Sequence, residues 1–483
     1  MLAALAAVLV VGLAAAGVAV VQPGPVAGWL GEAPATPDGA ADPSEPPPPP
    51  VLTAAGTAAP APTPDGIRAA LTPLINGSIL GNEVNISVVD PAGGEVLYEA
   101  GQETPTVPAS TTKLVTAATV LAARGPAYRI ATRVVAGANP GEVVIVGAGD
   151  PTLAVNGTGW YPGAGRLDRL AGQVKTALGG TRPTKVIVDG SLFPGPELEP
   201  AWDSDIPTGG FGAVITALMT DGARINPKDP GRAQARYADP DIAAGRLFAE
   251  QLGLPASAVR KGQAPAGATG TASPAAGASP GAGPPAAGAE LGRVESPPVI
   301  RLVEFMLENS DNVVGEALAR QVALARNKPA SFEGAAAAMD EVVAELGLPA
   351  NEIDVFDGSG LSRSNRITPS GLTDLLTLAA KGSRPELGDL FPGLPVGAWS
   401  GSLSERFDRS DGAEPTTAGA GAVRAKTGTL SGVHAIAGMV TTVDGRLLTF
   451  AVLANKVPDS VGIDRARLEL DRIAAALAAC GCR

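Results

Sequence analysis

The sequence predicts an α+β fold: one sheet is built from both ends of the chain, helices pack on it, and a β-rich domain is inserted. Hairpin patterns at residues 84–98 and 435–453 open and close the part of the chain that has regular apolar spacing. Between helical stretches, residues 136–295 alternate short β-rich runs with Gly, Pro and Asp turns. The middle of the chain is therefore expected to supply helices and the insertion.

The first elements are expected from residue 66 onward. Residues 67–80 have helical spacing, and β-prone runs at 84–89 and 96–98 flank an Asp-Pro-Ala-Gly-Gly turn. Residues 112–123 are largely apolar in a helical pattern that stops before a Gly-Pro pair, which is typical of a buried central helix.

The later elements follow the same rules. Short strands are expected at 143–146 and 185–188 within the insertion. Apolar β-prone runs at 435–443 and 447–453 flank an Asp-Gly pair, which is a two-residue hairpin signal. An amphipathic helix over 463–477 ends the pattern.

Two segments have compositions that cannot form a core. Apart from Gln263, residues 262–289 are all Gly, Ala, Pro, Ser or Thr, so we expect a disordered loop there. Residues 22–65 are dense in Pro and Ala, and this predicts a disordered, extended linker.

The start of the chain predicts export. Residues 2–21 contain no charge and could cross a bilayer as a helix, so residues 1–21 are interpreted as a signal peptide or a membrane anchor. A buried core helix is the alternative. No Lys or Arg precedes this run, and the first basic residue is Arg68, so either the usual basic start of a signal sequence is missing or the given start is internal.

Composition excludes several classes of function. The net charge of -12 and the 4 % aromatic content disfavour nucleic-acid binding. A single histidine, His434, makes a multi-His metal site or a Ser-His-Asp triad improbable, and we interpret it as a packed strand residue. Cys480 and Cys482 could pair with each other or with another chain.

A first candidate motif stands at the start of the expected helix over 112–123. Ser110 and Lys113 are three residues apart and would share one helical face. A desolvated lysine can take the proton of a serine hydroxyl, and the helix N-terminus offers N–H groups to an oxyanion. On its own the pattern is weak, because a capping serine followed by a solvated lysine is common.

Two further motifs are equally weak when taken singly. Ser310-Asp311-Asn312 interrupts an apolar helical region, as a surface turn or helix cap also would. Lys426-Thr427-Gly428-Thr429 precedes the closing hairpin, where glycine lets a strand lie close to a ligand, but it could also be the ordinary start of a strand.

The three motifs together, in this order and context, are specific. The sequence resembles the serine penicillin-recognising enzymes, which comprise DD-peptidases and serine β-lactamases. Ser310 follows Ser110 by 200 residues, which leaves room for the insertion. This layout resembles the D-alanyl-D-alanine carboxypeptidase/endopeptidase family of class C low-molecular-mass penicillin-binding proteins. Gly147–Leu153, Ser296–Pro298 and Asp357–Arg363 also resemble signatures of that family.

The resemblance implies a β-lactamase/transpeptidase-like domain, which is an antiparallel sheet with helices on both faces. Residues 66–135 and 296–483 would form this domain, and residues 136–295 would be inserted between the first and second motifs.

The resemblance also implies catalytic roles. Ser110 would be the nucleophile and Lys113 its base, with the ammonium form of Lys113 disfavoured by Lys426 nearby. Ser310 would relay a proton to the leaving amine. Asn312 would orient the substrate amide and hold Lys113.

Further residues would bind the substrate. Lys426 and Thr427 would bind the terminal carboxylate, Gly428 would admit the substrate backbone, and Thr429 would give an N–H to the oxyanion hole. Asp205 and Arg363 would bind the zwitterionic meso-diaminopimelate side chain.

By the same resemblance the substrates are peptidoglycan stem peptides, cleaved by carboxypeptidase and also endopeptidase action. β-Lactams would be covalent inhibitors, no metal or cofactor is needed, and the protein would meet a membrane only through its N-terminal segment in the cell envelope. The alternatives are a serine β-lactamase and a catalytically silent peptidoglycan-binding scaffold. The long insertion argues against the first, and the intact motifs argue against the second.

Overall fold

The computed structural model describes residues 59–76, 79–229, 231, 233–266, 285–408 and 416–481. The predicted signal or anchor segment (1–21), nearly all of the predicted linker (22–65) and most of the predicted loop (262–289) lie outside the described residues. Within the described ranges, no helix has both the length and the apolar character needed to cross a membrane.

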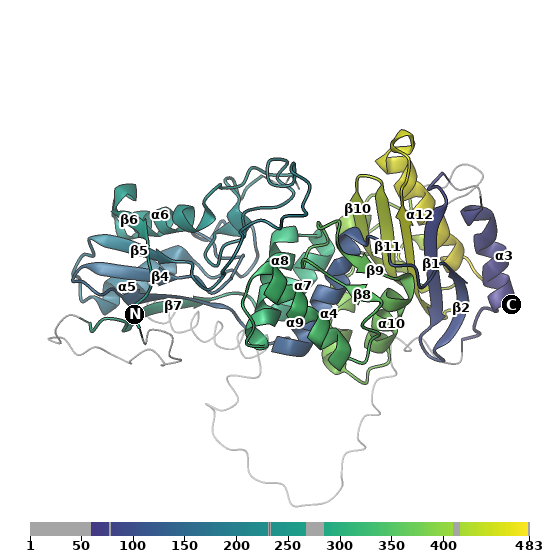
Figure 1. Ribbon diagram of the computed structural model, residues 1–483, viewed down its shortest axis with the longest axis horizontal. Helices are drawn as coiled ribbons and strands as arrows, with labels where there is room; N and C mark the ends of the chain where they lie inside the picture. Colours follow the sequence, from purple (N-terminus) through teal and green to yellow (C-terminus); the bar gives the residue numbers. More distant parts are fainter. Residues whose placement is uncertain are drawn as a thin grey trace, which may run out of the picture. The chain divides into compact units, whose positions relative to one another are not determined.

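The first sheet joins the two ends of the described chain (Figure 1). All of its neighbouring strands are antiparallel. In spatial order they are β10 (Val423–Leu430), β11 (Val433–Thr441), β12 (Leu447–Asn455), β1 (Glu83–Asp90) and β2 (Glu95–Ala100). The central pairing of β12 with β1 is the return of the chain that the two hairpin patterns predict.

Helices cover both faces of this sheet. On one face α3 (Pro64–Ile75) and α12 (Ile463–Ala478) pack on each other and on the strands. On the other face α10 (Pro369–Ala380) packs on β1, β11 and β12. The predicted antiparallel sheet with helices on both faces is therefore confirmed.

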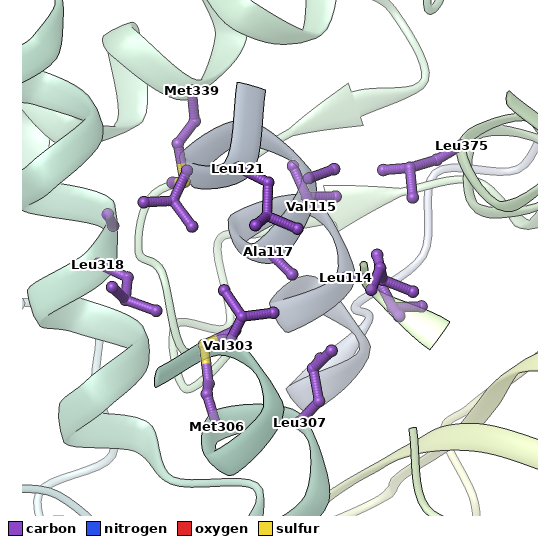
Figure 2. Close-up of a cluster of buried hydrophobic side chains, with 14 of the residues drawn as sticks. Leu114, Val115, Ala117, Leu121, Val303, Met306, Leu307, Leu318, Met339 and Leu375 are labelled. Atoms are coloured by element: carbon purple, nitrogen blue, oxygen red, sulfur yellow. The ribbon is translucent and has the colours of Figure 1, made fainter. Parts of the chain in front are cut away.

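A helical layer beyond α10 surrounds α4 (Thr112–Arg124). The helices α7 (Val299–Asn309), α8 (Asn312–Ala325) and α9 (Phe332–Glu345) pack on it. Figure 2 shows apolar side chains of these helices, among them Val303, Leu318 and Met339, gathered around those of α4. Because α4 is enclosed, the side chains at its N-terminus have fixed surroundings.

Smaller elements link this layer to the sheet. They are α11 (Pro385–Gly388), the two-residue strands β8 (Ile353–Asp354) and β9 (Arg366–Ile367), and the single turns η5 (Phe391–Gly393), η6 (Gly401–Leu403) and η7 (Thr417–Gly419).

The inserted segment has a five-stranded sheet of its own. Its order is β6 (Val259–Lys261), β5 (Lys185–Asp189), β4 (Glu142–Val146), β3 (Ala131–Ala136) and β7 (Glu290–Glu295). β4, β5 and β6 are parallel, and β3 is antiparallel to both of its neighbours. The two predicted strands are present.

The structure corrects two details of the insertion. β3 belongs to the second sheet, so the predicted boundary at 135/136 falls inside a strand; pairing with β4 and β7 decides its place. The insertion also contains α5 (Leu167–Ala177) and α6 (Pro240–Leu252), where β-rich runs alone were predicted. Their apolar residues pack on the sheet, and Leu167, Leu170, Ala171 and Val174 have the i, i+3, i+4, i+7 spacing of a helix.

Two local predictions are also corrected, and the ends of a third segment are described. The first helix is α3, which begins at Pro64 after the Thr63 cap and ends at Ile75, short of the predicted 80. The closing hairpin turns through three residues, because Thr442 N bonds Arg446 O at 2.8 Å; Val443, predicted in a strand, is 71 % exposed in this loop. The predicted loop over 262–289 is anchored at its described ends, since Gly262 N bonds Val188 O and Gly288 N bonds Ala136 O.

Candidate active site

Ser110 lies in a single helical turn, Ala109–Thr111, that leads directly into α4. Ala109 has a positive φ of 48°, so the chain turns sharply just before the serine. Lys113 is in the first turn of α4 and is completely buried, whereas Ser110 is partly exposed. The apolar residues that enclose α4 therefore also remove Lys113 from water.

Three oxygen atoms surround the Lys113 amine. Its Nζ lies 3.0 Å from Ser110 Oγ, 2.6 Å from Asn312 Oδ1 and 2.5 Å from the Ser359 carbonyl oxygen. In its neutral form the amine can accept the serine proton, while the amide of Asn312 and the Ser359 carbonyl keep it aimed at Ser110.

Burial lowers the pKa of Lys113 from 10.5 to about 8, and the carboxylates of Asp357, Glu316 and Asp311 oppose this shift. The resemblance assigned the lowering to Lys426. The structure makes loss of hydration the leading cause. At neutral pH a useful fraction of Lys113 is therefore deprotonated.

Glu316 organises the wall behind Lys113. One of its carboxylate oxygens accepts from the N–H groups of Gly358 and Ser359, at 3.1 and 2.9 Å, and the other from Arg320 at 3.2 Å. Burial, followed by the repulsion of Asp357, raises the pKa of Glu316 to about 7. Glu316 thus fixes the backbone segment that carries the Ser359 carbonyl, which accepts from Lys113.

The second motif forms the joint between α7 and α8. Ser310 ends α7 in the left-handed conformation, with φ 56° and ψ 39°, and its hydroxyl accepts from Lys426 Nζ at 2.9 Å. Asp311 caps α8 by accepting from two backbone N–H groups. Asn312 is the first residue of α8, and its Nδ2 donates to the Phe211 carbonyl at 2.7 Å.

The third motif lies in the edge strand β10. Lys426 is fully buried and also donates to the Thr427 carbonyl at 2.7 Å. At Gly428 a β-carbon would stand 2.8 Å from Pro108 O and 3.1 Å from Ser110 N, so only glycine lets β10 approach the serine. The Thr427 hydroxyl is 2.8 Å from that of Ser402.

These groups open into a cleft of about 560 Å³. The cleft is lined by Ser110, by Ser310 and Asn312, and by Thr427 and Thr429. The structure therefore brings the three motifs together around one concave site, with both lysines buried behind it.

This arrangement can acylate a serine without a histidine. Lys113 can take the Ser110 proton, and the Lys426–Ser310 pair can carry a proton to a departing amine. The hydroxyls of Thr427 and Ser402 both line the cleft. Among the described residues no group of three or more His, Cys, Asp or Glu side chains is placed to hold a metal ion.

Comparison with known proteins now decides the family. The model of the D-Ala-D-Ala carboxypeptidase 3 (S13) family matches residues 68–241 and 228–477. The chain belongs to this S13 family. Carboxypeptidase Rv3627c of Mycobacterium tuberculosis is 38 % identical over 439 residues, which is 89 % of this chain and 87 % of the relative. Carboxypeptidase DacB of Mycolicibacterium smegmatis is 34 % identical over 453 residues, 93 % and 90 % of the two chains.

A solved structure shows the same fold. The crystal structure of penicillin binding protein 4 (dacB) from Haemophilus influenzae superposes with a TM-score of 0.66 at 20 % identity, over 83 % of this chain and 97 % of that one. The predicted family, the serine DD-peptidase class and the fold are confirmed by these matches. A serine β-lactamase and a silent scaffold are not favoured.

Within this S13 protein, the two predicted side-chain-binding residues have different surroundings. Asp205 lines the cleft. Arg363 binds Asp203 instead, with its Nε 2.9 and 3.0 Å from the two carboxylate oxygens and its Nη2 2.8 Å from one of them. Arg363 also donates to the Ser431 carbonyl. Asp203, which also lines the cleft, was missed because two aspartates follow Trp202 and sequence alone did not separate them.

Other functional neighbours were missed because they act through contacts distant in sequence. They are the Ser359 carbonyl, Glu316, the Phe211 carbonyl and Ser402. Only Glu316 had a local signal, a buried glutamate four residues before Arg320 on one helical face. As predicted for a packed strand residue, His434 is 4 % exposed in β11. Cys480 is buried, and Cys482 lies outside the described residues.

Proposed function

We propose that this protein removes the terminal D-alanine of peptidoglycan stem peptides through an acyl-enzyme on Ser110. One observation carries the residue assignment: Lys113, buried behind the cleft and with a lowered pKa, stands 3.0 Å from the Oγ of Ser110, which lines the cleft. Family membership and relatives named carboxypeptidases support the reaction.

In the proposed acylation, neutral Lys113 takes the proton of Ser110 as its Oγ attacks the carbonyl carbon of the penultimate D-alanine. The C–N bond then breaks, Ser310 passes its proton to the leaving nitrogen and takes one from Lys426, and D-alanine departs. Water hydrolyses the ester, which returns Ser110 and releases the shortened peptide. Lys426 and Thr427 bind the terminal carboxylate, and the N–H groups of Ser110 and Thr429 face the oxyanion.

The test is intact-protein mass spectrometry of residues 59–483 incubated with benzylpenicillin, followed over time. A stable adduct on the wild type that is absent from Ser110→Ala supports the assignment. Rapid penicillin turnover without an adduct would point to a β-lactamase. A folded protein with neither adduct nor turnover would contradict the proposal.

A second groove favours cross-linked peptides as additional substrates. Its volume is about 660 Å³, and it is lined by Glu308, Arg424 and Trp399, the last 82 % exposed. Arg424 precedes Lys426 by two residues in β10, and alternate residues share one face of a strand. The groove therefore lies beside the strand that carries the third motif, two residues along β10 from Lys426, where a second peptide could be held.

Endopeptidase action can be separated from carboxypeptidase action. The double variant Trp399→Ala, Arg424→Ala should cleave a cross-linked muropeptide dimer more slowly while releasing D-alanine from a monomeric pentapeptide at the wild-type rate. Equal effects on both substrates would remove the support that this groove gives.

We also propose that the protein acts outside the cytoplasm, because residues 2–21 form an uncharged run long enough to direct export. Cell fractionation and N-terminal sequencing of the mature protein test this. A cytoplasmic protein with an intact N-terminus would contradict it.

A further inference from the structure

A buried ion pair joins the inserted segment to the second motif. Arg224 Nη2 lies 2.9 Å from Asp311 Oδ2, and the two side chains are 5 % and 4 % exposed. The Tyr161 hydroxyl donates to the same carboxylate oxygen at 2.9 Å and accepts from Arg224 Nη1 at 2.8 Å. The three side chains form a closed triangle of hydrogen bonds, which we call the Arg224 clamp.

Through Asp311 the clamp also restrains the two neighbouring residues, Ser310 and Asn312. Its second oxygen, Oδ1, accepts from Val313 N at 3.0 Å and Val314 N at 3.1 Å, which fixes the first turn of α8. Its own N–H donates to the Met306 carbonyl at 3.2 Å, at the end of α7. Ser310, which needs a left-handed conformation uncommon for serine, lies inside this frame.

The insertion also holds the motif from its other side. The Phe211 carbonyl accepts from Asn312 Nδ2 at 2.7 Å, which leaves the amide oxygen pointing at Lys113. Val313 is buried in an apolar cluster with Trp202 and Ile206 of the insertion. The turn that carries Ser310 and Asn312 is thus contacted by the insertion on both sides.

The segment that presents Arg224 has an unusual backbone. Three consecutive residues, Asp221, Gly222 and Ala223, have positive φ values of 51°, 61° and 64°. A β-carbon at Gly222 would stand 2.6 Å from Tyr161 Oη and 2.7 Å from Arg224 Nη1. This left-handed turn is packed directly against the clamp, and a larger residue at its centre would displace it.

The chemistry of the clamp is better suited to orienting its partner side chains than to stabilising the fold. A buried ion pair gives little net stability over an apolar replacement, because desolvation offsets the attraction. A guanidinium, however, donates in two fixed directions at once, here to Tyr161 and Asp311. The Arg224–Asp311 pair therefore fixes the orientation of the turn that carries Ser310 and Asn312.

We propose that Arg224 and Tyr161 are positioning residues for the reaction at Ser110. Through Asp311 they hold Ser310 against Lys426 and Asn312 against Lys113. The proposal rests on the proposed function of the Ser110 site. It makes the inserted segment part of the catalytic apparatus, in addition to any contact it has with the side chain of the substrate.

Arg224→Lys and Tyr161→Phe test the clamp. Lysine keeps the charge but cannot donate along two fixed directions, so the second-order rate of acylation by benzylpenicillin and kcat/KM for a D-Ala-D-Ala peptide should fall by the same factor, at least about tenfold. Tyr161→Phe, which keeps the ion pair, should give a smaller loss of both. Displacing Asn312 also removes an acceptor from protonated Lys113, so the rise of acylation with pH should move to lower pH.

Arg446→Lys is the matched control, because it disturbs another buried arginine–aspartate pair, with Asp90, whose side chains are 11 % and 4 % exposed. That pair contacts none of the three motifs in the described chain. Arg446→Lys should lower the melting temperature, as Arg224→Lys should. It should leave the acylation rate, kcat/KM for the peptide and the pH profile as in the wild type.

The outcomes separate the hypotheses. Wild-type rates in folded Arg224→Lys would overturn the proposal, and so would a loss confined to the peptide substrate, since that would make Arg224 part of a substrate subsite. If Arg224→Lys does not fold, Tyr161→Phe decides by the same criteria. Absence of acylation in the wild type would reject the proposed function and this proposal with it.

Discussion

Lys113 combines two properties that ordinarily conflict: three oxygen acceptors favour its ammonium form, while burial favours the free amine. Burial prevails, and the result is a base that titrates near pH 8. Its nearest carboxylates limit how far the pKa can fall. Basicity at this site therefore depends on residues that never touch the substrate.

Acylation by benzylpenicillin should rise with pH through the titration of Lys113, by about tenfold between pH 7 and 9. Because Glu316 raises the pKa of Lys113, Glu316→Gln should move this rise to lower pH. Stopped-flow acylation rates measured from pH 5 to 10 check both points.

Glu345→Gln, which alters an ion pair of α9 with 26 % and 48 % exposed side chains, is the control and should leave the profile unchanged. A profile that is flat across pH 8 in the wild type would contradict the assignment of Lys113 as base.

Gly428→Ala should lower the acylation rate at least about tenfold, because its β-carbon would force β10 away from Ser110 N. Melting temperature and acylation rate measured on the same sample separate local displacement from unfolding. Acylation at the wild-type rate would show that β10 can move without consequence for the serine.

At the scale of single residues, sequence alone predicts the three motifs well. Each motif is local, so its spacing carries its meaning. Tyr161, Arg224 and Asp203 could not be predicted, because their partners lie 150, 87 and 160 residues away along the chain. No local spacing marks such contacts.

At the scale of elements, sequence predicts β1, β2, β11, β12 and α12 to within a few residues, since each has a clear apolar period. It gives no bounds for β10 and no helix at the position of α10. It misses α5 and α6, whose polar faces are exposed. The frequent Gly, Pro and Asp turns of residues 136–295 led to the prediction of strands alone. It also misplaces Val443, because the apolar run does not show that the hairpin loop has three residues. Tertiary pairing decides such boundaries.

The two helices of the insertion give a matched pair of substitutions. Gly172→Ala in α5 places a β-carbon with no atom within 4 Å, so it should stabilise the protein by about 0.5–1 kcal/mol through helix propensity. Gly245→Ala in α6 would place one 2.3 Å from Val188 Cγ2 of β5 and should destabilise it. Equilibrium urea unfolding measures both, and a gain at Gly245 would contradict the packing of α6 on β5.

At the scale of the whole molecule, sequence predicts that both ends of the chain form one sheet and that an insertion separates the motifs. It does not predict that the insertion is a mixed sheet with helices, nor where its strands begin. β3 lies in the second sheet only because β4 and β7 pair with it. Composition carries no information about such pairing.

Buried carboxyl groups set the pH dependence of global stability. Burial raises the pKa of Asp150, Asp221 and Asp340 from 3.8 to about 6, and that of Glu316 to about 7. Between about pH 4 and 7 the folded chain therefore binds more protons than the unfolded chain, so the free energy of unfolding falls as pH rises. Two groups act oppositely. Burial lowers the pKa of His434 from 6.5 to about 4, which offsets part of this fall between those pH values. The pKa of Asp311 is lowered to about 2, and its contribution is lost as pH falls below 3.8.

The melting temperature, measured at constant ionic strength, should accordingly be highest near pH 4–5 and decline toward pH 7. Asp340→Asn should make this decline shallower. A melting temperature that rises steadily from pH 4 to 8 would contradict the raised pKa values.

The chain enters and leaves the insertion at one point, where Ile130 N bonds Ser296 Oγ at 2.9 Å and Ser296 N bonds Ile130 O at 2.9 Å. Because both ends of the insertion meet at this junction, the insertion could be exchanged between related genes without changing the fold of the rest of the chain. The Arg224 clamp sets a condition on that exchange. A transplanted insertion that lacks the arginine would leave the buried Asp311 carboxylate without its ion-pair partner, between Ser310 and Asn312, so chimeric enzymes should work only when donor and recipient supply matching halves of the pair.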